Sequence, residues 1–240
     1  SRVRDAFPSK LGMVYRVKKV EVAPFTGTVY NLSVKEDESY VAFGRAVHNC
    51  STDAAIHGAF FAAELSLATT EGRITDVPYD PALPVDTDWD IGVDDAMVIW
   101  FSQATKGGQV RVIDYYENRG EGLPHYAQVL RDKRDKYHYA YGNHWAPHDI
   151  AVREVGTGKS RQETAAALGI RFLIVPRISF ADGIHSVRMV LPRCYFDRTK
   201  CEVGLNALRH YRRKYNAGLK EFYGTAVHDA FSHAGDGFRG

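Results

Sequence analysis

The 240-residue sequence predicts an α/β fold, in which a mixed sheet is flanked by helices and a small all-β segment comes first. Residues 10–49 hold only short β-branched and aromatic runs, separated by Gly and Pro. From residue 88 onward, strand-like apolar runs alternate with segments of helical periodicity. Hydrophobic residues make up 45% and charged residues 25%, so the composition is that of an ordinary soluble globular protein.

The all-β segment is expected to contain several short strands and to be too small for a core of its own. A polar turn at Lys35–Ser39 separates its two halves, and Gly44 interrupts the second half. The expected strands are Met13–Val22, Thr28–Val34, Tyr40–Phe43 and Ala46–Val47.

A helix and an extended connector are expected next. Ala54–Leu67 is rich in Ala and has apolar residues at helical spacing. Three prolines in Ile74–Val85 favour an extended linker between domains.

The remaining residues predict the mixed sheet and its helices. Lys106-Gly107-Gly108 is expected to turn a hairpin between two strands. Ser160 and Glu163 form a capping-box pattern, and Gly169 follows as a helix stop. The expected strands are Met97–Phe101, Val110–Tyr116, Tyr137–Tyr141 and Phe172–Val175, and the expected helices are Leu123–Lys133, Ser160–Leu168, Glu202–Tyr215 and one starting near Ser232.

Acidic residues carry the strongest chemical signal. Asp90 belongs to the first strand of the α/β region, and Asp149 follows a later strand. Asp229, His233 and Asp236 would share one face of a C-terminal helix. Carboxylates that gather at one sheet edge repel one another unless hard cations such as Mg²⁺ or Mn²⁺ bind them. Two such ions support hydrolysis of a nucleic-acid backbone.

Structural interpretations of the same residues stay open. Asp94, Asp95 and Asp114 could be strand-end turn residues, Asp149 could cap a helix, and His233 could be a surface histidine. A zinc hydrolase competes because the chain has ten histidines, but no HExxH motif occurs. Gly156–Ser160 ends in GKS, yet the first glycine of a phosphate loop is absent. The three cysteines have no metal-type spacing, and their odd number, without an export signal, favours a reduced, cytosolic protein.

Positive charge is locally clustered although the formal net charge is only +2. The clusters are Arg131–Lys136 and the run from Arg209 through Arg212, Arg213 and Lys214. A solvated helix face explains such a run, and so does a DNA-backbone contact. No apolar run approaches the roughly 18 residues of a membrane helix.

Residues 50–240 resemble phage terminase large subunits. The resemblance rests on CSTDAAIHGAFFAAEL, EGRITDVPYDPALPV and TDWDIGVDDAMVIWF, followed in order by PHDIAVREVGTGKSRQETAAALGI and HDAFSHAGDGFR. It implies an RNase H-like nuclease that uses two Mg²⁺ or Mn²⁺ ions. By motif, Asp90, Asp149 and Asp236 would bind metal, with Asp229 as the alternative to Asp236 and His233 beside them. Asp114 and Glu117 are secondary candidates, and Gly237 stands where the family usually has Ala.

That family cuts concatemeric viral DNA at the start and end of packaging, in the host cytoplasm. The resemblance implies double-stranded DNA, a terminase ATPase domain, the small terminase and the portal as partners, and no membrane. The basic run Arg209–Tyr215 becomes a DNA-backbone candidate in this context. No nucleotide-binding motif occurs, so an ATPase motor would be separate.

Residues 10–50 resemble the C-terminal splice region of inteins, through GTVYNLSVKEDESYVAFGRAVHNC. The resemblance implies that Asn49 cyclises, that His48 assists by proton transfer and that Cys50 is the nucleophile after the intein. An N-terminal intein half would then be a partner. The expected organisation is an intein (Hint-type) segment at residues 1–49, a terminase linker region at 50–85 and a nuclease domain at 86–240. A self-processing precursor whose nuclease stays inactive until joined to a motor is the alternative, and a catalytically dead DNA-binding module is a third.

Overall fold

The computed structural model divides the chain into two compact units, Ser1–Ser51 and Thr52–Gly240. It describes residues 6–9, 12–15, 39–42, 45–48, 58–92, 96–153, 158–216, 218–219 and 221–239. No described helix is long and apolar enough to cross a membrane.

The first unit contains two antiparallel hairpins. One pairs β1 (Ala6–Ser9) with β2 (Gly12–Tyr15), and the other pairs β3 (Ser39–Ala42) with β4 (Arg45–His48). The second hairpin confirms the strands expected on either side of Gly44. The expected strand Thr28–Val34, the splicing candidates Asn49 and Cys50, and the acidic pair Asp94 and Asp95 lie outside the described residues.

A seven-stranded mixed sheet is the centre of the second unit, with strand order β10-β9-β6-β7-β8-β11-β5. Strands β6, β7 and β8 form an antiparallel meander, whereas β9 and β10 run parallel to β6 on one side and β11 and β5 run parallel to β8 on the other. The strands are β5 (Ile74–Thr75), β6 (Val85–Asp90), β7 (Ala96–Ala104), β8 (Val110–Arg119), β9 (Tyr141–Ala146), β10 (Phe172–Ile174) and β11 (Cys194–Asp197).

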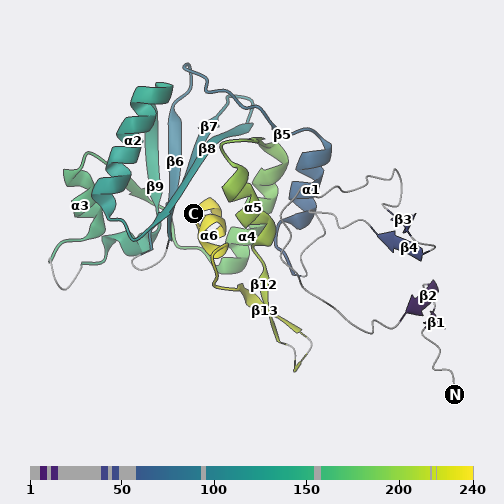
Figure 1. The fold of residues 1–240 in the computed structure, drawn as a ribbon. Helices are drawn as coiled ribbons and strands as arrows, with labels where there is room; N and C mark the ends of the chain where they lie inside the picture. Colours follow the sequence, from purple (N-terminus) through teal and green to yellow (C-terminus); the bar gives the residue numbers. More distant parts are fainter. Residues whose placement is uncertain are drawn as a thin grey trace. The chain divides into compact units, whose positions relative to one another are not determined.

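Helices cover both faces of this sheet, as the sequence predicts (Figure 1). One layer holds α2 (Leu123–Tyr137) and α3 (Arg161–Ala167). The other holds α1 (Ala62–Thr70), α4 (Phe180–Val190), α5 (Glu202–His210) and α6 (Ser232–Arg239). Two short 3₁₀ turns, η1 (His148–Ala151) and η2 (Leu191–Arg193), follow β9 and α4. A separate hairpin pairs β12 (Arg213–Asn216) with β13 (Glu221–Ala226).

The alternation of β6 separates two apolar cores. Val85, Thr87 and Trp89 are buried on the α2 face, where Trp89 packs with Phe172 and Tyr126. Asp86, Asp88 and Asp90 alternate with them and therefore point to the face covered by α4, α5 and α6. A strand with acidic side chains on one buried face is unusual, and it marks this face for closer attention.

Local sequence signals explain several element ends. The capping box is present: Ser160 Oγ accepts from the Glu163 amide at 3.1 Å, and a Glu163 carboxylate oxygen accepts from the Ser160 amide at 2.8 Å. Gly108, at φ +80°, turns the β7–β8 hairpin, as expected.

Two expected elements are wrong in their bounds. Helix α2 runs through Tyr137 and ends with His138 in the left-handed region, so the strand expected at Tyr137–Tyr141 starts only at Tyr141. The helix expected at Glu202–Tyr215 stops at His210. The Tyr211 carbonyl instead accepts from the Phe60 amide at 2.9 Å, and the chain continues into β12. Backbone pairing with a distant segment therefore outweighs the helical periodicity of this run.

Residues 74–85, where a linker is expected, are packed into the second unit. Ile74 and Thr75 pair with β11 as β5, and the side chains of Val77 and Val85 are buried. Gln103 holds the turn between them, because its amide nitrogen donates to the carbonyls of Asp80 and Leu83 at 2.8 Å.

Candidate metal-binding cleft

Two acidic residues lie at the carboxyl ends of neighbouring parallel strands. Asp90 is the last residue of β6, and Asp149 lies in η1, three residues after β9 ends. Strands β6 and β9 are adjacent and parallel, so both residues lie at the same edge of the sheet. The sequence predicts that acidic side chains gather at such an edge of the sheet.

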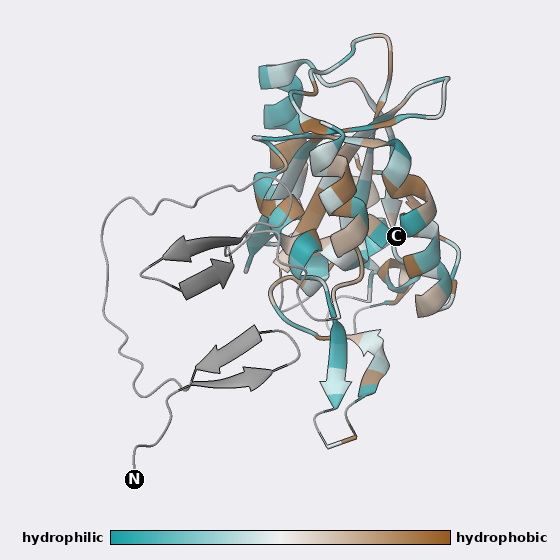
Figure 2. Cartoon of the chain, turned by 90° about the vertical axis from the view of Figure 1, so that its right-hand side faces the viewer, coloured by the Kyte–Doolittle hydropathy of each residue, from teal (hydrophilic) through white to brown (hydrophobic). Residues whose placement is uncertain are grey.

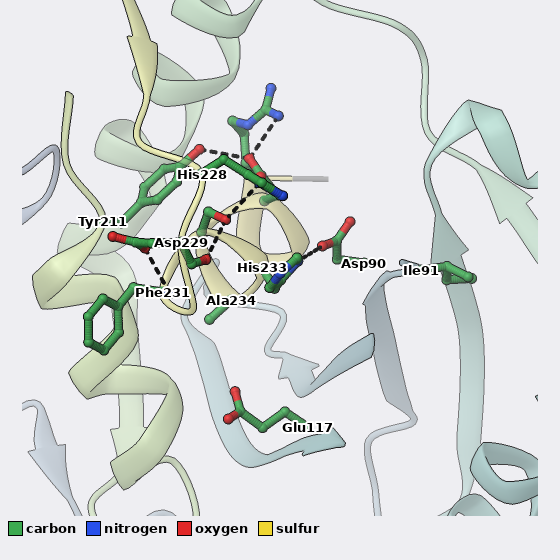
Figure 3. Close-up of polar contacts among 12 residues, drawn as sticks. Asp90, Ile91, Glu117, Tyr211, His228, Asp229, Phe231, His233 and Ala234 are labelled. Carbon is green, nitrogen blue, oxygen red and sulfur yellow. Dashed lines mark hydrogen bonds and ion pairs between the residues drawn. The ribbon is translucent and has the colours of Figure 1, made fainter. Parts of the chain in front are cut away.

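Helix α6 adds two more polar residues because it packs closely over β6 and β7. A Cβ added at Gly237 would lie 2.8 Å from Val98 Cγ2 and 3.3 Å from the Asp90 backbone nitrogen. Only a residue without a side chain allows this approach, so the glycine that replaces the expected alanine has a packing reason. The close packing brings His233 toward Asp90 (Figure 3). Asp236, on the same helix, lines the same cavity as Asp90.

The side chains of Asp90 and His233 are in direct contact. His233 is buried, and its Nδ1 lies 3.2 Å from Asp90 Oδ2. Burial raises the pKa of Asp90, the His233 contact opposes that shift, and the negative charges of Asp236 and Asp149 raise the pKa further. Three acidic side chains therefore act on one another electrostatically at this edge.

A buried tyrosine and an arginine hold Asp236. The Tyr211 hydroxyl donates to Asp236 Oδ1 at 2.7 Å, and Arg239 Nη2 donates to the same oxygen at 3.1 Å. The Tyr211 ring lies against Gly235, where an added Cβ would come within 2.5 Å of the ring. Among the described residues, Asp236 Oδ2 and Asp90 Oδ1 have no hydrogen-bond partner. Each carboxylate is therefore oriented through one oxygen and keeps the other available.

Asp229 does not join this cluster, which corrects one prediction. Helix α6 begins only at Ser232, so Asp229 precedes it and does not share a helix face with His233 and Asp236. Its Oδ1 accepts from the Phe231 amide at 2.9 Å, and its Oδ2 pairs with Arg212 at 2.9 Å. Figure 3 shows Asp229 directed toward Phe231 rather than toward Asp90.

The two secondary candidates, Asp114 and Glu117, do not line the cleft that Asp90 and Asp236 share. Asp114 is buried with Lys133, whose Nζ lies 2.5 Å away. Val98 on β7 is the cross-strand partner of both Asp90 on β6 and Glu117 on β8. The three side chains therefore lie on the same face of the sheet. Its carboxylate accepts from the Tyr115 hydroxyl at 2.5 Å.

A cleft of about 320 Å³ opens beside Asp90 and Asp236. It is also lined by Trp89, Pro147, His148, Val175, Pro176, Arg177, Ile178, Phe180 and Arg239. The described part of the chain contains no ready-made group of three His, Cys, Asp or Glu side chains that could hold a metal ion. The carboxylates at this edge therefore do not form a closed protein cage for a metal.

The four basic residues predicted to bind DNA lie apart from the cleft lining. Arg212 pairs with Asp229, Arg213 lies 5.5 Å from the Phe60 ring centroid, and Lys214 lies 5.7 Å from that of Tyr223. Arg209 is half-buried in the last turn of α5. The β12–β13 hairpin that carries Arg213 and Lys214 projects from the helical layer, and β12 is mostly hydrophilic (Figure 2).

Comparison with known proteins adds evidence on the fold. No protein-family model and no curated protein matches the chain. The large terminase of a thermophilic bacteriophage, in complex with ADP, matches with a TM-score of 0.57 and 13% identity, over 76% of this chain and 43% of that chain. A further structure of the same thermophilic phage terminase matches with a TM-score of 0.52 and 14% identity, over 69% of this chain and 40% of that chain. The P22 large terminase nuclease domain matches with a TM-score of 0.51 and 16% identity, over 70% of this chain and 86% of that chain.

These matches show a shared fold. The seven-stranded mixed sheet flanked by helices is similar to the fold of the P22 large terminase nuclease domain, and it agrees with the mixed α/β class that the sequence predicts. The chain spans less than half of the length of the thermophilic phage terminase chains that it matches. The matches say nothing of an intein segment.

Sequence reasoning missed the residues that orient the carboxylates. Tyr211 stands within a basic run and carries no motif, and its role depends on Gly235 lying opposite it. Arg239 follows Asp236 by three residues, a helical spacing that could have suggested the ion pair.

Proposed function

We propose that the second unit is a divalent-metal-dependent endonuclease that cuts concatemeric viral DNA during genome packaging. The observation that carries this proposal is that Asp90 and Asp149 follow adjacent parallel strands at one sheet edge, with Asp236 beside Asp90 in the lining of an open cleft. The shared fold supports the same function, because the P22 match is a large terminase nuclease domain.

The residues at this edge suit Mg²⁺ or Mn²⁺ better than a softer metal. All three proposed ligands are carboxylates, and the cleft has room for water and substrate. Mg²⁺ usually binds through one or two carboxylates and completes its shell with waters and substrate phosphates, so it needs no closed protein cage. Two such ions, when bound, activate water and stabilise the leaving oxygen of a phosphodiester.

The chain's own residues prepare the carboxylates for this task. His233 holds Asp90 through Oδ2, while Tyr211 and Arg239 hold Asp236 through Oδ1. The free oxygens, Asp90 Oδ1 and Asp236 Oδ2, are then the atoms that would bind metal. Such supporting hydrogen bonds fix the orientation of ligands and tune their affinity.

Nicking of supercoiled plasmid tests the proposal. Mg²⁺ and Mn²⁺ should support cleavage, and Ca²⁺ should bind without supporting it well. Asp90→Asn and Asp149→Asn should each abolish nicking, whereas Asp76→Asn, at an exposed carboxylate that does not line the cleft, should not. Full activity in both cleft variants would remove the proposed site.

A packaging nuclease would need DNA and the other packaging proteins as partners. Double-stranded DNA would be the substrate, and a terminase ATPase motor, the small terminase and the portal would be the packaging partners in the host cytoplasm. Cleavage should be sensitive to salt and weakly sequence-specific, since phosphate contacts would dominate binding.

A second proposal concerns self-processing at Asn49 and Cys50, close to the residue where the first unit ends in the sequence. The chain divides at Ser51, and the hairpin β3–β4 ends at His48, directly before Asn49 and Cys50. We propose that Asn49 and Cys50 serve in splicing, together with a separate N-terminal intein half. Asn49→Ala with Cys50→Ala should block processing and leave plasmid nicking intact, whereas Asp90→Asn should have the opposite effect.

A further inference from the structure

The loop between β10 and α4 places an arginine on the wall of the cleft. Arg177 follows β10 by three residues and precedes the α4 cap, Ser179. It lines the same cavity as Asp90 and Asp236. Because β10 runs parallel to β9 and β6, this loop leaves the sheet at the edge that carries the carboxylates.

The two arginines of the cleft differ in how far they are already engaged. Arg239 pairs with Asp236 at 3.1 Å, and its guanidinium lies 4.9 Å from the Phe180 ring centroid. Arg177 is exposed and has no ion pair or hydrogen bond through its side chain with any described residue. Although it lines a cavity with two carboxylates, Arg177 is paired with neither of them.

An unpaired guanidinium suits the substrate that the cleft would receive. A phosphodiester that approaches Asp90 and Asp236 meets negative charge, and a nearby cation lowers that cost. Arginine binds phosphate through two parallel N–H···O bonds, which fixes orientation as well as charge. Half-exposed Ile178 and Pro176 flank Arg177 on the wall and offer apolar surface of the kind that a sugar can cover.

We propose that Arg177 binds a backbone phosphate of the DNA next to the scissile one and so sets the path of the strand across the cleft. This inference rests on the proposed nuclease function and adds a substrate-binding residue to it. It places the DNA over the loop that joins β10 to α4, apart from the basic run at Arg209–Lys214.

Arg171 provides a matched control. It is exposed, has no side-chain partner among the described residues, and directly precedes β10. Arg171 and Arg177 therefore lie at opposite ends of the same strand, and only Arg177 lines the cleft. Removing either one changes the net charge equally, so a difference between the two variants reports position.

The experiment measures binding of a short fluorescent DNA duplex by anisotropy in Ca²⁺, together with the KM for its cleavage in Mg²⁺. Arg177→Ala should raise both Kd and KM by about tenfold, and the slope of log K against log salt should fall by about one. Arg177→Lys should recover part of the loss, since lysine keeps the charge without the bidentate geometry. Arg171→Ala should match the parent.

The outcomes separate this inference from the function on which it rests. If Arg177→Ala binds and cleaves the duplex like Arg171→Ala, the assignment of Arg177 is wrong even though the nuclease is active. If the parent protein cuts nothing in Mg²⁺ or in Mn²⁺, the nuclease proposal fails, and the binding data alone then decide whether Arg177 contacts DNA. Thermal unfolding of each variant checks that the fold is unchanged.

Discussion

Two carboxylates on opposite faces of the sheet have very different surroundings. Asp114 is buried on the α2 face, where it pairs with Lys133 at 2.5 Å and accepts from the Tyr115 amide at 2.8 Å. Asp90, on the α6 face, contacts His233 at 3.2 Å and lies near the like charges of Asp236 and Asp149. Asp114 has an ammonium partner of its own, whereas Asp90 lies among like charges beside an open cleft, where Arg239 pairs with Asp236.

The difference separates structural from functional acidic residues. The Lys133 ammonium neutralises Asp114 and also lies 4.9 Å from the Phe101 ring centroid, so this group is complete without a ligand. In the Asp90 cluster, Arg239 pairs with one of the three carboxylates, so negative charge remains that an external cation could neutralise. Buried charges are stable in proteins when they are paired or when they bind metal. Removing the carboxylate charge should therefore have opposite effects on stability at the two sites.

Neutralising the cleft should have the largest effect on activity. Asp90→Asn should lower the rate of plasmid cleavage by more than about 100-fold, because ion binding contributes several kcal/mol of charge stabilisation in the transition state. Stability should hold or rise, since one buried charge among like charges is removed. Cleavage rates and thermal unfolding should be measured together, and a variant that cuts at the parent's rate would contradict the assignment.

Breaking the Asp114 pair should instead act on stability. Asp114→Ala leaves the Lys133 ammonium buried without its partner, which costs about 3–5 kcal/mol of unfolding free energy. The melting temperature should fall by about 6–20 °C. Asp132→Ala, at an exposed site on the same helix, is the control and should change little. Adding Lys133→Met to Asp114→Ala should recover stability, and no recovery would argue against a simple buried pair.

Removing the Tyr211 hydroxyl should weaken metal binding without removing a ligand. Tyr211→Phe frees Asp236 Oδ1 from one of its two donors, so affinity for Mn²⁺ should fall by about tenfold. Isothermal titration calorimetry gives the affinity directly. The exposed Tyr223, which accepts a hydrogen bond from Asn216, offers the matched Tyr→Phe control. Equal Mn²⁺ affinity in both variants would leave Tyr211 with a packing role alone.

The smallest expected effect concerns Asp88, which lies on the α6 face of β6 beside Trp100 and Val187. Burial and the charge of Asp86 raise its pKa from 3.8 to about 7. A pKa raised on folding contributes stability that is full below about pH 4 and is lost as pH rises through 7. Asp88→Asn should therefore unfold a few degrees higher than the parent at pH 8 and show little difference at pH 4. A constant difference across that range would contradict the shift.

The sequence carried enough information for the fold and for part of the site. The sequence predicted that Asp90 and Asp149 follow strands whose ends meet at one sheet edge, and β6 and β9 are adjacent and parallel, although β9 begins only at Tyr141. Their role as metal ligands stays a prediction. The helix that carries His233 and Asp236 was predictable from their spacing. Its start near Ser232 was predicted as well, but the placing of Asp229 on the same helix face was wrong, because Asp229 precedes the helix and contacts Arg212 and the Phe231 amide.

The missing parts depend on contacts between distant segments. Tyr211 leaves the helical pattern because its backbone pairs with Phe60, and Gly235 then receives its ring. Helix α4, which was not predicted from the sequence, begins just after Arg177, and its first residue, Phe180, lines the cleft. None of these contacts has a signature within a short window, so only three-dimensional packing discloses them.

Anomalous scattering from crystals grown with Mn²⁺ tests the central claim most directly. We predict manganese peaks in the cleft, within about 2.3 Å of carboxylate oxygens of Asp90 and Asp236, and their loss in Asp90→Asn. Saturating Mn²⁺ that leaves this strand edge without a peak would contradict the proposed metal site.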